Sequence, residues 1–132
     1  MTRTIQTMYT VFRYLLISKK VEVQVWPDLR EAHDATCNKG IGRKDLETKF
    51  PGLNFGECPE EWDFPPHCTD DATVRAERVR RRLGEIAREG KYKDVVLVTH
   101  RGFAAFMVQG DRFSVCGKQS KTQITCECRL MV

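Results

Sequence analysis

Two short segments of the sequence combine residue types that can do chemistry on an anion. His100 and Arg101 directly follow the apolar run "VVLVT". Glu31 and His33 lie in "DLREAHD", which comes just after the alternating run "VEVQVW". In open α/β sheets the ligand crevice lies beyond the carboxyl ends of the strands, and a helix beginning there adds free backbone N–H groups. The sequence therefore predicts one basic cleft in which these four residues surround an anionic ligand.

The elements that must position these residues alternate between helical and strand patterns. Ile5, Met8 and Phe12 share one helical face, whereas "VEVQVW" alternates strictly until Pro27 and "VVLVT" is a continuous run typical of a strand covered on both faces. The expected elements are helices at 3–17, 43–50, 72–90 and 103–108 and strands at 21–26, 95–99 and 124–130, with a long loop over most of 28–71. This order predicts an α/β domain with a mostly parallel sheet.

Composition and charge limit the class of protein. The 132 residues suit one domain, and 41% apolar residues suffice for a core. A net charge of +4 favours anionic ligands. We find neither a signal-peptide pattern nor an apolar run of about 20 residues, and therefore expect a soluble, cytoplasmic protein without a membrane partner. In that compartment the six cysteines are expected to be free thiols.

Two clusters of cysteine and histidine invite a metal-site interpretation that we do not favour. His33 and Cys37 lie four residues apart, without the "C-x-x-C" spacing of a zinc site. Cys58, His67 and Cys68 lie in a proline-rich loop and offer three candidate ligands. No metal and no cofactor are expected.

The arginine-rich segment "RAERVRRRLGEIAREGK" also has a simpler interpretation than a nucleic-acid site. Its outward arginines alternate with glutamates, and the spacing of Glu77 and Arg81 predicts a favourable i, i+4 pair. Interleaved carboxylates repel a phosphate backbone, and no aromatic platform accompanies the arginines. We expect a solvated helix face and no nucleic-acid partner.

Four motifs in this order resemble the histidine phosphatase superfamily. They are "RTIQT" (3–7), "WPDLREAHD" (26–34), the arginine-rich helix after "DD", and "VVLVTHRGF" (95–103). The similarity is to the phosphoglycerate mutase-like branch, and especially to its fungal members. It implies a three-layer α/β sandwich with a mostly parallel sheet, and hydrolysis or transfer of phosphate esters through a phosphohistidine.

The resemblance also implies roles for individual residues. Arg3 corresponds to a phosphate-binding arginine, Glu31 to the acid that protonates the leaving oxygen, and His100 to the second, phosphate-binding histidine. Arg101 stands where many members have a small residue, and is either a contact for a second anionic group of the substrate or a solvated side chain. The expected partner is a phosphorylated small molecule or phosphate.

One departure from the family pattern changes the expected activity. The Arg-His-Gly motif that carries the family's nucleophile is absent from these residues. Residues 1–132 therefore resemble a truncated domain missing its first strand and helix, and we expect an inactive pseudoenzyme of the phosphatase (hydrolase) class. Loss of an interior strand would expose sheet edges, which suggests a homo-oligomer. The alternatives are a non-catalytic binding or assembly protein using that edge, and a fragment of a longer active phosphatase.

Overall fold

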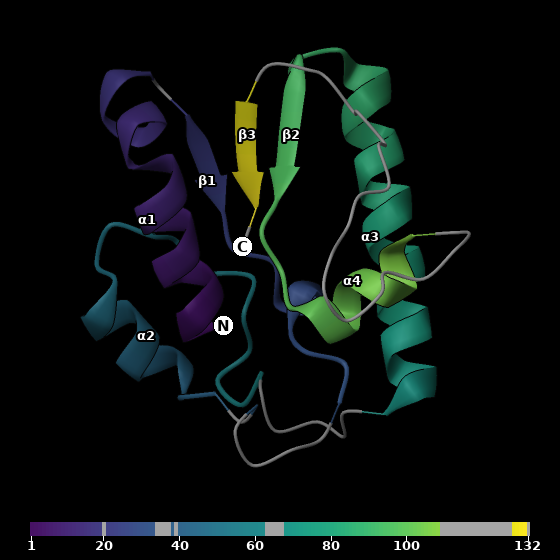
Figure 1. The fold of residues 1–132 in the computed structure, drawn as a ribbon. Helices are drawn as coiled ribbons and strands as arrows, with labels where there is room; N and C mark the ends of the chain where they lie inside the picture. The colour runs from purple at the N-terminus through teal and green to yellow at the C-terminus, as the bar shows by residue number, and fades with distance from the viewer. Residues whose placement is uncertain (20, 34–37, 39, 63–67, 109–127, 132) are drawn as a thin grey trace.

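A computed structural model describes residues 1–132 except 20, 34–37, 39, 63–67, 109–127 and 132 (Figure 1). Its elements are α1 (Thr2–Ser18), β1 (Glu22–Gln24), the 3-10 helix η1 (Pro27–Leu29), α2 (Arg43–Lys49), α3 (Thr69–Glu89), β2 (Asp94–Leu97), α4 (Arg101–Met107) and β3 (Cys128–Met131). Each expected helix and strand corresponds to an element of the same type. Residues 124–127 of the last expected strand lie outside the described residues.

The three strands form one parallel sheet in the order β1–β3–β2, so the last strand along the chain lies in the middle (Figure 1). β3 pairs with β1 from Glu22↔Arg129 onward and with β2 from Asp94↔Cys128 onward. The expected α/β class is confirmed, and the described strands pair in parallel. Among the described strands, β1 and β2 each pair with β3 alone, and the sheet edge expected from a missing strand stays a prediction.

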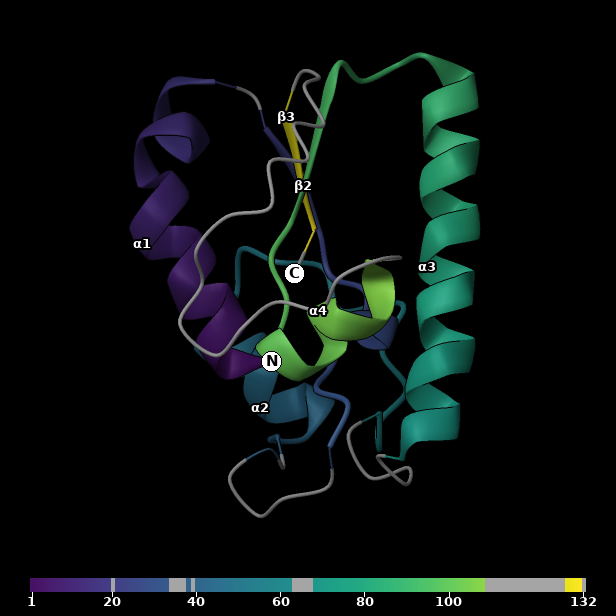
Figure 2. The same cartoon turned by 45° about the vertical axis from the view of Figure 1, so that its right-hand side comes forward.

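Helices cover both faces of this sheet. Figure 2 shows α1 on one side of the strands and α3 on the other. The cluster on the α1 side contains Met1, Ile5, Met8, Val25, Leu46, Phe55, Cys58 and Trp62. The cluster on the α3 side contains Trp26, Leu29, Ala32, Ala72, Ala76, Val79, Ile86 and Phe103. Burial of these apolar faces, worth roughly 25 cal/mol per Å², holds the helices against the sheet.

The ends of α3 follow from local chemistry. Asp70 and Asp71 lie in its first turn, where carboxylates oppose the positive end of the helix dipole. The Sγ atom of Cys68 accepts a hydrogen bond from the backbone N–H of Asp71 at 3.4 Å. Gly90 ends the helix with a φ of +63°, a conformation that glycine adopts without steric cost.

Burial differs from expectation in two elements. The four residues of β2 are half-buried, not enclosed on both faces. Among the described strands β2 has one neighbour, which leaves it less enclosed than an interior strand. Residues 103–108 are all apolar, which predicts a helix buried all round, but in α4 Phe103 is fully buried and residues 104–107 are half-buried. No described helix is both long and apolar enough to cross a membrane.

Candidate active site

His100 and Glu31 converge at one end of the sheet. His100 is the N-cap residue of α4 and follows β2, while Glu31 follows β1 and η1. The Nδ1 atom of His100 lies 3.8 Å from Oε2 of Glu31, and the two side chains are 9% and 13% exposed. The structure thus brings together the two side chains on which the expected site depends.

The Glu31 carboxylate accepts a hydrogen bond within its own loop and occupies space that is free because residue 102 is a glycine. Its Oε1 atom accepts a hydrogen bond from the backbone N–H of Ala32 at 2.7 Å. A Cβ atom at Gly102 would meet this oxygen at a separation that real Cβ atoms essentially never show. Because Gly102 lacks a Cβ, the carboxylate can rest against the first turn of α4, beside His100.

A hydrogen bond ties the two site segments together. The Oγ1 atom of Thr99, next to His100, donates to the backbone carbonyl of Leu29 at 2.7 Å. Leu29 is the last residue of η1 and is buried. The end of β2 and the loop that carries Glu31 are therefore fixed to each other by more than sheet pairing.

His33, which the sequence places in the expected cleft, also lies close to this pair of side chains. Its ring is exposed, and its Cδ2 atom would lie 3.0 Å from a Cβ at Gly102. The same point is close to the Glu31 carboxylate. His33 therefore borders the mouth of the site, as the strand-end argument predicted.

Arg3 and Arg101 lie at the edge of this group. The first turn of α1 adjoins the site, since the amino nitrogen of Met1 lies 3.4 Å from Nε2 of His100. In that turn Arg3 is exposed and donates to Oδ1 of Asn38 at 3.1 Å. Asn38 in turn donates to the backbone carbonyl of His33 at 2.9 Å. Arg101 is exposed at the first residue of α4.

The arrangement suits an oxyanion better than a metal ion. An imidazole can donate to a phosphate oxygen, and a neighbouring carboxyl group can protonate a leaving alkoxide. Within the described part of the chain, no three His, Cys, Asp or Glu side chains are placed to hold a metal ion. His67 and Cys37, members of the two clusters considered for metal, lie outside the described residues.

Sequence reasoning missed Arg75, a fully buried arginine of α3. It lies on the apolar stripe of the helix, three residues after Ala72 and four before Val79. A charged residue at an inward position is a signal of a buried hydrogen-bonding role. The outward arginines differ from expectation as well, because Glu77 pairs with Arg80 and not with Arg81.

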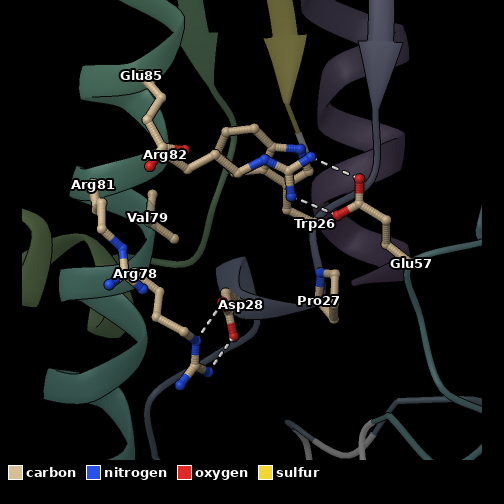
Figure 3. Close-up of a pocket in the computed structure, with 9 residues that line it drawn as sticks. All are labelled: Trp26, Pro27, Asp28, Glu57, Arg78, Val79, Arg81, Arg82 and Glu85. Carbon is tan, nitrogen blue, oxygen red and sulfur yellow. Dashed lines mark hydrogen bonds and ion pairs between the residues drawn. The ribbon is translucent and has the colours of Figure 1, made fainter.

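A hollow of about 460 Å³ lies away from these residues, between α3 and the segment after β1 (Figure 3). Arg78 forms two hydrogen bonds with the Asp28 carboxylate, which raises the pKa of Arg78. Arg82 pairs with Glu57 and stacks 4.0 Å above the Trp26 ring. These charges balance one another within the hollow, which favours a structural role over ligand binding.

Comparison with known proteins agrees with the motif resemblance. The family model of the histidine phosphatase superfamily (branch 1) matches residues 1–110. A probable phosphatase of Schizosaccharomyces pombe is 38% identical over 65 residues, which are 49% of this chain and 30% of that protein. No solved structure matches the chain. Since the family model covers most of its length, the chain belongs to the histidine phosphatase superfamily.

Proposed function

We propose that this chain is a phosphoglycerate mutase-like protein that binds phosphate monoesters at a site formed by His100 and Glu31. The single observation that supports this function is the 3.8 Å approach of the two side chains in a nearly enclosed position. His100 donates to a phosphate oxygen, and Glu31 is placed to protonate the ester oxygen. Arg3 and Arg101 supply positive charge at the rim of the site. The fold proposed is the three-layer sandwich of that branch.

We further propose that the 132-residue chain binds phosphate esters without turning them over. None of its three histidines stands in an Arg-His-Gly motif, the motif that carries the attacking imidazole of the family reaction. The anion-holding histidine and the acid do not replace a nucleophile, because neither accepts the phosphoryl group in that mechanism. Purified protein should therefore release no p-nitrophenol from p-nitrophenyl phosphate above the buffer rate. Turnover that is abolished by His100→Ala would refute this part of the proposal.

Binding itself is tested by titration with inorganic phosphate, followed by calorimetry or NMR. His100→Gln should weaken phosphate affinity about tenfold, the ~1.4 kcal/mol at the low end for a hydrogen bond to a charged group. Glu31→Gln should leave the affinity unchanged or raise it, because it removes a like charge beside the anion. Arg88→Gln, on the exposed face of α3, controls for loss of a distant positive charge. Equal affinity of the wild type and His100→Gln would refute binding at this site.

A further inference from the structure

Arg75 is the one arginine among the described residues whose side chain is 0% exposed. It lies in the second turn of α3, inside the cluster that packs this helix against the sheet. A buried guanidinium is costly unless its charge is paired and its N–H groups are bonded. The hydrogen-bond partners of Arg75 therefore indicate its role in the structure.

Four hydrogen bonds join this guanidinium to two separate segments. Nε donates to Oδ2 of Asp71, one turn earlier in α3, at 2.7 Å. Nη1 donates to the backbone carbonyls of Asp28 at 2.7 Å and Arg30 at 3.0 Å. Nη2 donates to the backbone carbonyl of Glu31 at 3.1 Å. Three of the four bonds thus fix the main chain that ends at the site carboxylate.

The same guanidinium contacts the element that begins at His100. Its Cζ atom lies 4.6 Å from the centroid of the Phe103 ring, a cation–π contact in the buried cluster. Phe103 lies in the first turn of α4, three residues after His100. Arg75 is therefore bonded to the backbone of Glu31 and packed against the helix that His100 caps.

We propose that Arg75 is a positioning residue that sets the Glu31 carboxylate beside His100. This inference rests on the proposed function, because the side chains that Arg75 positions are those of the proposed phosphate site. A planar guanidinium presents five N–H donors in a fixed fork, whereas the lysine ammonium is a point charge on a flexible stem. The fork can serve one carboxylate and three carbonyls at once. Lysine at this position keeps the charge and loses that geometry.

The test uses the ring resonances of His100 in the full chain, assigned by their loss in His100→Gln. Glu31→Gln serves as reference, because it shows where these resonances move when the carboxylate is no longer beside the ring. Arg75→Met and Arg75→Lys are compared with wild type, and circular dichroism verifies that each variant is folded. Arg78→Met is the matched control. Arg78 is on the same helix and bonds Asp28, but its side chain is 44% exposed and its bonds end on that carboxylate.

The expected result is that folded Arg75→Lys shifts the His100 resonances by at least half of the Glu31→Gln displacement, and Arg75→Met by at least as much. Arg78→Met should leave them at the wild-type position. Wild-type resonances in folded Arg75→Lys would overturn the proposal, and so would an equal shift in the Arg78 control. If Arg75→Met does not fold, Arg75→Lys decides, since it keeps a cation against Asp71. Absence of phosphate binding by the wild type would reject the proposed function and leave this comparison intact.

Discussion

Replacement of Gly102 by alanine should displace the Glu31 carboxylate from its place beside His100. The new Cβ would have to stay about 3.4 Å from Oε1 to make ordinary van der Waals contact, so the carboxylate must retreat by about 1 Å. That movement stretches the 2.7 Å bond from the Ala32 N–H beyond hydrogen-bonding range. His33 must also yield by a few tenths of an ångström, which its exposed ring can do.

The cost of this change can be compared with its benefit. A hydrogen bond to a charged group contributes roughly 1.5–3 kcal/mol when it is well placed. The bond from the Ala32 N–H to Glu31 is only part-buried, so we expect its contribution at the low end of this range. Alanine in a helix is favoured over glycine by roughly 0.5–1 kcal/mol. We therefore expect Gly102→Ala to lower the free energy of unfolding by about 1 kcal/mol. For a chain of this length that corresponds to a fall in Tm of roughly 3–5 °C.

A double-variant cycle isolates the contact that causes the loss. In a Glu31→Ala background the colliding oxygen is absent, so Gly102→Ala should be neutral or stabilising there. Gly84→Ala is the control for helix propensity, because a Cβ at that position of α3 meets nothing within 4 Å and should stabilise the fold. Urea denaturation measures the free energies of unfolding of the wild type, the two single variants at Gly102 and Glu31, their double variant and the Gly84→Ala control. An equal loss from Gly102→Ala in both backgrounds would refute the claim that this glycine makes room for the carboxylate.

Three further predictions concern the surroundings of the site and the core. Thr99→Val removes the donor to the Leu29 carbonyl and should destabilise the fold by roughly 1–3 kcal/mol in urea denaturation, since a part-buried acceptor loses its partner; an unchanged midpoint would contradict this. Burial raises the pKa of the Cys58 thiol to about 11. At pH 8 a thiol reagent should therefore label buried Cys58 far more slowly than exposed Cys68, as followed by peptide mass spectrometry. Because the unfolded thiol ionises near pH 9, stability should also fall as the pH rises from 9 to about 11, and a Cys58→Ala variant should lack this fall. Gly90→Ala forces alanine to a φ of +63° and should cost roughly 1–2 kcal/mol, whereas no loss of Tm would contradict the strain.

Side-chain periodicity predicted the helices and strands because each depends on burial of a local face. The stripe through Ile5 and Met8 predicted α1, and both residues are fully buried. Strand order was beyond this kind of reasoning. A periodic pattern shows that 128–131 form a strand, but not that this strand lies between two others about 100 and 30 residues earlier in the sequence. That placement depends on tertiary pairing, for which one sequence carries no local signal.

The site was predictable where it depends on strand ends and unpredictable where it depends on loops. Glu31 and His100 each follow a strand of a parallel sheet, and strand ends meet at one edge. Arg75 was missed because its partners are backbone carbonyls 44 to 47 residues earlier, in a segment without periodicity. The role of Gly102 likewise depends on the close approach of a loop that follows another strand.

The contacts that place Glu31 beside His100 do not involve the nucleophile motif of the family. Arg75, Thr99 and Gly102 hold Glu31 beside His100 through the interior of α3, the end of β2 and the start of α4. None of the three belongs to an Arg-His-Gly motif, so the carboxylate and the imidazole meet without one. Under the proposed function, binding of a phosphate ester depends on His100, whereas its turnover also requires a nucleophile. The phosphate titration addresses the first property and p-nitrophenyl phosphate turnover the second, which allows the two to be accepted or rejected independently.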